Sequence, residues 1–237
     1  MTKQEKRYEV EPGDAVHRGP PVTVDRYTAG ARINHWITAA CLVLLALSGL
    51  SLFHPSLFFL TALFGGGQIT RAIHPWIGVV LLVSFLGLFI RFWTLNLWRR
   101  DDITWLSRLR DVLTSHEERL PEVGKYNAGQ KMVFWLMSIL IVILILSGIV
   151  IWDRYFSEYF TVTQQRIAVL IHSAAAVTII CVWITHVYAA IWIRGTFSAM
   201  IRGHVTGGWA WKHHRRWLKQ LVSGKPKDSN TGKTAAR

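Results

Sequence analysis

Four histidines stand within or at the ends of long apolar stretches of this 237-residue chain, a costly place for an ionisable side chain. They are His35, His74, His172 and His186. An imidazole in such a stretch either forms a hydrogen bond between helices or ligates a metal or cofactor. The spacing of the four, and the elements that carry them, bear on which of these roles applies.

The apolar stretches are long enough to cross a bilayer. A spanning helix needs about 20 predominantly apolar residues, and four stretches of this chain contain no Asp, Glu, Lys or Arg. The sequence therefore predicts an all-α, integral membrane four-helix bundle. Its spans are expected at 34–53, 73–95, 132–152 and 167–193. Residues 54–70 are expected to form a short connection with a turn around 57–64.

Basic residues indicate the orientation of the spans. The chain has 27 Lys and Arg and a net charge of +13. All but Arg71, Arg154 and Arg166 lie before the first span, at the end of the second span or in the connection to the third, or after the fourth. The positive-inside rule then places both termini in the cytoplasm. The charge thus reports orientation and gives no reason to expect nucleic-acid binding.

The flanking segments complete the expected organisation. Residues 1–30 are polar, so we expect a loosely ordered cytoplasmic tail and no cleaved signal peptide. The transmembrane domain is expected at 31–195. Residues 196–222 mix apolar and basic side chains, which suits a helix on the membrane surface or a solvated tail. Residues 223–237 have the composition of a disordered tail.

Depth in the membrane sorts the histidines into pairs. With both termini inside, His35 and His186 lie toward the cytoplasm, and His74 and His172 lie toward the outside. His172 and His186 are 14 residues apart, which puts them on nearly the same helix face and about 21 Å apart along the axis. Two planar cofactors, one above the other, fit this arrangement. Bis-histidine ligation of two haems is the chemistry we expect.

Two further patterns agree with haem, and each has a simpler explanation. Arg32 and Arg71 each precede a histidine by three residues and could bind a haem propionate, or could be ordinary interfacial arginines. Small residues are also common wherever membrane helices pack. A zinc site would need about four ligands at one point, and these histidines divide two and two. The residue four positions after each histidine is small: Ala39, Gly78, Ala176 and Ala190.

Several motifs resemble one known family, the gamma subunit of membrane-bound respiratory formate dehydrogenase, a diheme cytochrome b556. The resemblance covers about residues 26–220, and its most specific stretch is Val-Gly-Lys-Tyr-Asn-Ala-Gly-Gln-Lys at 123–131. The remaining matching stretches are 32–36, 73–75, 170–174, 186–188 and 212–214.

The resemblance implies the ligands of two b haems. His74 and His172 would bind the outer haem iron, and His35 and His186 the iron of the cytoplasmic-side haem. The partners would be an iron–sulfur beta subunit outside the membrane and a molybdenum or tungsten alpha subunit that oxidises formate. The location would be the bacterial cytoplasmic membrane, and the heterotrimer could form a higher oligomer.

The resemblance also implies a quinone site at Asn127, Gly129 and Gln130, near His186. Menaquinone or another quinone would accept the electrons there, which would contribute to the membrane potential. Amide side chains and an exposed backbone can hydrogen-bond a quinone carbonyl. From the residues alone, Asn127 is better explained as a cap of the third helix.

The expected function is therefore electron transfer and quinone reduction within a formate:quinone oxidoreductase, with no formate oxidation on this chain. One alternative is a diheme cytochrome b anchor of a nickel–iron hydrogenase or a thiosulfate reductase. An alternative of another class is a four-helix transporter without haem. The spans lack the acidic residues that many transporters carry.

Overall fold

A computed structural model describes residues 9–114, 116 and 119–224. The chain divides into two compact units. The membrane unit comprises Tyr27–Leu97 and Gly129–Gly203. The polar unit comprises the residues up to Arg26, Trp98–Ala128 and the residues from His204 onward.

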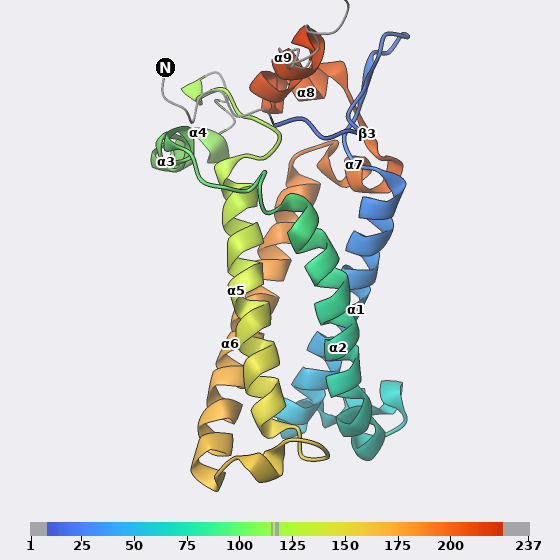
Figure 1. The fold of residues 1–237 in the computed structure, drawn as a ribbon, viewed down its shortest axis with the longest axis vertical. Helices are drawn as coiled ribbons and strands as arrows, with labels where there is room; N and C mark the ends of the chain where they lie inside the picture. The colour runs from blue at the N-terminus through green and yellow to red at the C-terminus, as the bar shows by residue number, and fades with distance from the viewer. Residues whose placement is uncertain (1–8, 115, 117–118, 225–237) are drawn as a thin grey trace, which may run out of the picture. The chain divides into compact units, whose positions relative to one another are not determined.

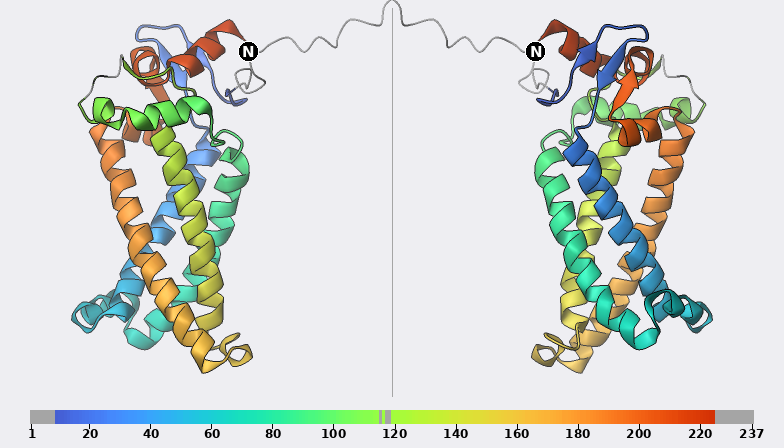
Figure 2. Two further views of the ribbon diagram at one scale, coloured as in Figure 1. Left: turned by 90° about the vertical axis from the view of Figure 1, so that its left-hand side faces the viewer. Right: turned by 90° about the vertical axis from the view of Figure 1, so that its right-hand side faces the viewer.

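Four long helices make up the membrane unit (Figures 1 and 2). They are α1 (Ala29–Phe53), α2 (Gly67–Phe92), α5 (Ala128–Ile151) and α6 (Val162–Trp192). All four are long and apolar enough to cross a bilayer, yet only 17–22% of their most apolar windows is buried within the protein. Their exposed apolar side chains need a lipid environment. The predicted fold class is confirmed, and α2, α5 and α6 begin four to six residues before the predicted spans.

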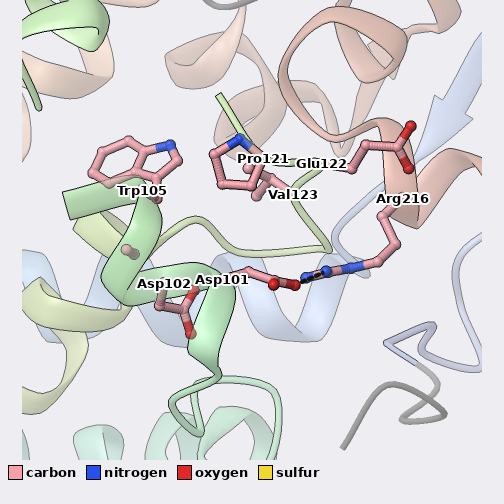
Figure 3. Close-up of a pocket in the computed structure, with 8 residues that line it drawn as sticks. Asp101, Asp102, Trp105, Pro121, Glu122, Val123 and Arg216 are labelled. Atoms are coloured by element: carbon pink, nitrogen blue, oxygen red, sulfur yellow. Dashed lines mark hydrogen bonds and ion pairs between the residues drawn. The ribbon is translucent and has the colours of Figure 1, made fainter. Parts of the chain in front are cut away.

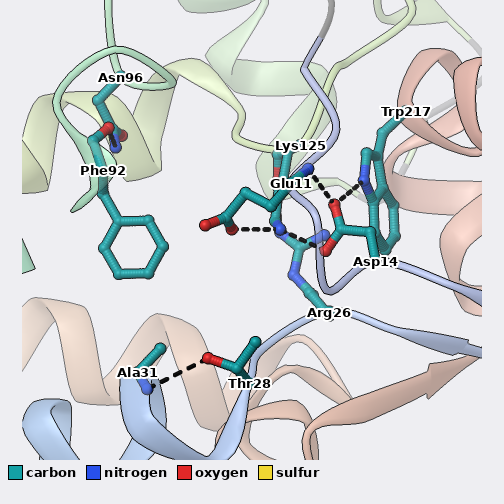
Figure 4. Close-up of polar contacts among 9 residues, drawn as sticks. All are labelled: Glu11, Asp14, Arg26, Thr28, Ala31, Phe92, Asn96, Lys125 and Trp217. Carbon is teal, nitrogen blue, oxygen red and sulfur yellow. Dashed lines mark hydrogen bonds and ion pairs between the residues drawn. The ribbon is translucent and has the colours of Figure 1, made fainter. Parts of the chain in front are cut away.

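Local capping explains where these helices begin and end. The Thr28 hydroxyl accepts a hydrogen bond from the backbone N–H of Ala31 at 3.4 Å and caps α1 (Figure 4). The connection after α1 contains a 3-10 helix, η1 (Pro55–Phe64), which replaces the expected turn. Gly65 and Gly66 end η1 with φ values of 89° and 103°, a conformation that favours glycine.

The core of the membrane unit lies between the two histidine levels along α6. Ala175 and Ile179 belong to this core and stand in the sequence between His172 and His186. All four long helices contribute, so the core fixes their mutual positions at mid-height. The buried cluster consists of Cys41, Leu42, Leu81, Leu140, Ile141, Ala175 and Ile179.

Among its described residues, the polar unit contains a small antiparallel sheet and four helices. The strands are β1 (Val16–His17), β2 (Thr23–Asp25) and β3 (His204–Thr206), in the order β1-β2-β3. The helices are α3 (Arg100–Ser107), α4 (Leu109–Leu113), α8 (Gly207–His213) and α9 (Arg215–Ser223).

The prediction of a loosely ordered N-terminal tail is wrong for residues 9–26. Val24 on β2 pairs with Val16 on one side and with Val205 on the other. Val24 is fully buried and Val205 nearly so, which gives the sheet a small apolar centre. The pairing partner lies about 180 residues away in the sequence, and a local pattern does not report it.

The segment 196–222 also differs from the surface helix or solvated tail that its composition suggested. It contains α7 (Thr196–Arg202), β3, α8 and α9. Gly203 ends α7 with a φ of 89°. A β-carbon there would stand 2.9 Å from the carbonyl oxygen of Tyr27, so glycine permits a close approach. Residues 225–237 of the predicted disordered tail lie outside the described residues, and the domain boundaries remain a prediction.

Candidate functional site

The structure brings the four histidines of the membrane unit together in two pairs. The ring centroids of His74 on α2 and His172 on α6 are 6.3 Å apart. Those of His35 on α1 and His186 on α6 are 6.4 Å apart. These are the pairs expected from the sequence, and α6 supplies one histidine to each.

This separation is the one that two imidazoles on opposite sides of a metal ion require. A metal–imidazole nitrogen bond is about 2.0–2.1 Å long, and the nitrogen lies about 1.2 Å from its ring centroid. The centroids of two opposed imidazoles would thus be about 6.4 Å apart. No group of three or more His, Cys, Asp or Glu that could hold a metal occurs among the described residues. The donor set therefore fits two axial ligands of a haem better than a zinc site.

The hydrogen bond of His74 leaves one ring nitrogen free for a metal. Ser48 on α1 donates its hydroxyl proton to the carbonyl oxygen of Leu44, at 2.7 Å. With that proton committed, the hydroxyl oxygen accepts from His74 Nδ1, also at 2.7 Å. The neutral imidazole then carries its proton on Nδ1 and a lone pair on Nε2. Outer-sphere partners of metal-binding histidines act in this way.

His172 has the same arrangement on the opposite side. Ser147 on α5 donates to the carbonyl oxygen of Ile143 at 2.6 Å and lies 3.0 Å from His172 Nδ1. Both serines are buried, at 0% exposed for Ser48 and 6% for Ser147. Helix α5, which carries no histidine, thus orients a histidine of α6.

A glycine follows each of these serines and stands beside the imidazole, where a β-carbon would make ordinary van der Waals contact. A β-carbon at Gly49 would lie 3.4 Å from His74 Cε1, and one at Gly148 would lie 3.5 Å from His172 Cε1. The sequence analysis missed this feature, although a signal exists. The tripeptide Leu-Ser-Gly occurs in both the first and the third span, at 47–49 and 146–148.

The His35–His186 pair is built differently. His35 Nδ1 is buried and has no hydrogen-bond partner among the described residues. The ring of Trp36 stands edge-on to His35, with centroids 5.5 Å apart. Trp36 in turn lies 3.4 Å from the carbonyl oxygen of Met200 through its Nε1. Aromatic packing thus contacts the His35 ring, whereas a hydroxyl holds each ring of the His74–His172 pair.

The two candidate propionate arginines have different surroundings. Arg32 Nη1 donates to the carbonyl oxygen of Ile201 in the last turn of α7, and its Nε is buried without a partner in the described part of the chain. Arg71 on α2 is exposed. Arg32 therefore keeps an unused donor, and the role of both residues in binding propionates stays a prediction.

Two open places lie near the His74–His172 pair. A β-carbon added at Gly78, four residues after His74, would meet nothing within 4 Å. An open, mostly apolar groove of about 440 Å³ runs between α5 and α6, and Ser147 and Ala168 are among its lining residues. The groove thus adjoins the hydroxyl that holds His172.

The candidate quinone residues lie at the start of α5. Asn127 immediately precedes this helix, and Gly129 and Gln130 are in its first turn. In the polar unit, Trp105, Val123 and Arg216 line a cavity of about 10 Å³ (Figure 3), which is room for about one water molecule. A quinone ring does not fit there, so the quinone assignment still depends on the three residues of the predicted site.

The sequence analysis gave His214 no role beyond its place in the matching stretch 212–214. Its ring is 1% exposed and donates from Nδ1 to the carbonyl oxygen of Gly124 at 2.7 Å. Burial, with the nearby charge of Arg26, holds the pKa of His214 well below its ordinary value. The ring is therefore neutral and serves as a fixed donor within the polar unit.

Comparisons with known proteins agree with this geometry. Residues 26–203 match the family of prokaryotic cytochrome b561. The chain is 46% identical over 199 residues to the formate dehydrogenase cytochrome b556(fdo) subunit of Escherichia coli strain K12, covering 84% of this chain and 93% of the relative. It is 40% identical over 196 residues to the nitrate-inducible cytochrome b556(Fdn) subunit of the same organism, covering 83% and 90%.

A third relative comes from another organism. The formate dehydrogenase cytochrome b556 subunit of Haemophilus influenzae is 38% identical over 200 residues, which is 84% of each chain. The four apolar helices and these matches identify a membrane-embedded cytochrome b. The chain belongs to the prokaryotic cytochrome b561 family and resembles, over most of its length, the cytochrome b556 subunits of formate dehydrogenases.

Proposed function

We propose that the chain binds two b haems, one between His74 and His172 and the other between His35 and His186. The observation that carries this proposal is the centroid separation of 6.3 and 6.4 Å in the two pairs. The serine hydroxyls that fix the Nδ1 protons of His74 and His172 support it, since each leaves Nε2 free to bind iron. Haem bound in this way supplies reversible one-electron transfer.

The protein would relay electrons within a formate dehydrogenase complex. Its relatives are named as subunits of such enzymes. The donor would be an iron–sulfur beta subunit, and a molybdenum or tungsten alpha subunit would oxidise formate. The membrane unit would hold the relay in a fixed position and keep water away from it, through the apolar core between the histidine levels.

The direction of transfer follows from the proposed orientation. Lys and Arg concentrate in the segments that precede α1, connect α2 to α5 and follow α6, so the positive-inside rule would put these segments in the cytoplasm of a bacterial cell. The His74–His172 pair would then face the outside and receive the electrons first. Inward movement of one electron works against a membrane potential by about 2.3 kcal/mol per 100 mV. The transfer would contribute to that potential.

A quinone, with menaquinone as the expected species, would accept the electrons near His186. Asn127 and Gln130 would hydrogen-bond its carbonyl oxygens, and Gly129 would leave room for its ring beside the backbone. The N-terminal dipole of α5 would favour the developing negative charge on a carbonyl oxygen. Protons for the reduced quinone would come from the cytoplasm.

A pyridine haemochrome assay on the purified complex tests the cofactor proposal. We expect two b haems for each copy of this chain. Replacement of His172 by Ala should remove one of them and stop reduction of the other by formate. Replacement of His186 should leave one haem that formate still reduces. One haem in the wild type, or full quinone reduction by the His186 variant, would contradict the proposed path.

Co-purification tests the proposed partners. An iron–sulfur protein and a molybdopterin-type formate-oxidising subunit should accompany the chain from its native membrane. Recovery of a nickel–iron hydrogenase or a thiosulfate reductase instead would support the alternative within the same class of cytochrome b anchors.

A further inference from the structure

A short N-terminal segment, Glu9–Asp14, contacts the motif that precedes α5 within the polar unit. The family match begins at residue 26, so this segment lies outside the matched range. It nevertheless has a defined place. The N–H of Glu11 donates to Asp14 Oδ2 at 3.0 Å, and the N–H of Glu9 donates to Gln220 Oε1 at 3.1 Å. Three carboxylates are thereby directed at residues 124–125 and their neighbours.

Two of these carboxylates neutralise Lys125 (Figure 4). Lys125 Nζ lies 2.5 Å from Glu11 Oε2 and 2.6 Å from Asp14 Oδ1, and its side chain is fully buried. Trp217 Nε1 donates to the second oxygen of Asp14 at 3.0 Å. A buried ammonium group is strongly disfavoured without a paired anion. The observed position of Lys125 therefore depends on the N-terminal segment.

The third carboxylate occupies the space that a side chain at residue 124 would need. A β-carbon on Gly124 would stand 1.2 Å from Glu9 Oε2. Glu9 cannot move away without loss, because Arg99 Nη1 holds its other oxygen at 2.8 Å and both side chains are buried. Glycine at 124 and the carboxylate of Glu9 are thus fitted to each other.

The backbone of the same residues is held from the other side. Three consecutive carbonyl groups accept hydrogen bonds from groups near the two ends of the chain. They are Val123 from Arg216 N at 3.1 Å, Gly124 from His214 Nδ1 at 2.7 Å, and Lys125 from Arg26 Nη2 at 2.5 Å. Side chains, backbone and charges of this stretch are all fixed within the polar unit.

We propose that Glu9, Glu11 and Asp14 are positioning residues for quinone reduction. They hold residues 124–125 in place, and the chain leads directly from there to Asn127 and to Gln130. This inference rests on the proposed quinone site. The three carboxylates do not touch the quinone; they fix the backbone from which its hydrogen-bonding side chains extend.

A suppressor experiment on the complete complex tests the contact between Glu9 and residue 124. Gly124→Ala should raise the KM for a soluble menaquinone analogue about tenfold or more, with smaller effect on kcat, because the amides are displaced. Formate should still reduce both haems at the wild-type rate. Glu9→Ala in the same chain removes the clashing carboxylate and should restore KM to within about threefold of the Glu9→Ala single variant.

Two further sets of variants complete the experiment: a control substitution at another glycine, and substitutions of the proposed quinone-binding residues themselves. Gly208→Ala is the control, since a β-carbon there meets nothing within 4 Å, and its KM should equal that of the wild type. An unchanged KM in Gly124→Ala, or a raised KM that Glu9→Ala does not restore, overturns the inference. If Asn127→Ala and Gln130→Ala also leave KM unchanged, the proposed quinone site itself is wrong.

If the Gly124→Ala variant does not assemble, a second variant tests the same inference. Glu11→Gln combined with Asp14→Asn keeps the shape of both side chains and removes the charges that neutralise Lys125. We expect a higher KM for the quinone analogue with two haems still bound and reduced by formate. A wild-type KM in this variant would overturn the positioning role.

Discussion

Removal of the Ser147 hydroxyl should change the properties of one haem and not the other. In the structure this hydroxyl lies 3.0 Å from His172 Nδ1 and has its own proton committed to the carbonyl of Ile143 at 2.6 Å. The accepted hydrogen bond makes the imidazole a stronger electron donor to iron, which favours the ferric state. Ser147→Ala should therefore raise the midpoint potential of the proposed haem at His172.

The size of the shift follows from the energy of one hydrogen bond. A bond of this kind contributes about 0.5–1.5 kcal/mol. For a one-electron couple about 59 mV corresponds to 1.4 kcal/mol. Loss of the whole energy of this hydrogen bond would therefore raise the midpoint potential by about 20–60 mV. Loss of an outer-sphere partner also lowers metal affinity by about 10–100-fold. Partial loss of that haem during purification is therefore expected.

The assay is a redox titration of the visible α-band in the purified complex. Ser138→Ala is the matched control, because Ser138 lies on the same helix, is also 6% exposed and donates to the carbonyl of Phe134 at 2.7 Å. No histidine contacts its hydroxyl. An equal shift in both variants, a downward shift in Ser147→Ala, or a shift of the other haem would refute the assigned role of Ser147.

Two further predictions test other parts of the structure. Gly49→Leu should prevent binding of the proposed haem at His74, since a β-carbon at this position already touches that ring at 3.4 Å and the rest of the leucine side chain needs further space, and the haemochrome assay should then give one haem. The polar unit should lose stability as the pH falls below 6.5, because unfolded His214 takes up a proton that the buried ring, whose pKa is lowered, does not. At pH 5.5 the loss from this residue is about 1 kcal/mol relative to neutral pH. Hydrogen exchange should show a smaller loss in His214→Gln, in which His213, whose pKa burial lowers to about 4, still contributes.

The features that the sequence predicted well are those with a strong local signal. Absence of charge over about 20 residues is such a signal, and the four spans were predicted from it. The histidine pairs also followed, because helical geometry fixes the relation of His172 to His186 and topology fixes depth. The structure contains both predicted pairs, each with its ring centroids at about the separation of two imidazoles on opposite sides of a metal.

The features that were missed depend on contacts between distant segments. Ser147 has no evident role until α5 is placed against His172, since a serine in an apolar helix more often bonds only the preceding turn. The N-terminal segment looked loosely ordered because its partners are Lys125 and Arg99, about 90–110 residues away. The sequence of the segment shows that it is polar, but it does not show which distant basic groups its carboxylates neutralise.

The different surroundings of the two pairs bear on the direction of electron flow. Both rings of the His74–His172 pair have Nδ1 held by a hydroxyl, whereas His35 Nδ1 has no partner among the described residues. Stronger imidazole donation stabilises ferric iron, so the haem at His74 and His172 should have the lower midpoint potential. An electron that enters there would move to the haem at His35 with a gain in redox energy. That gain would offset part of the work of moving the charge inward against the membrane potential.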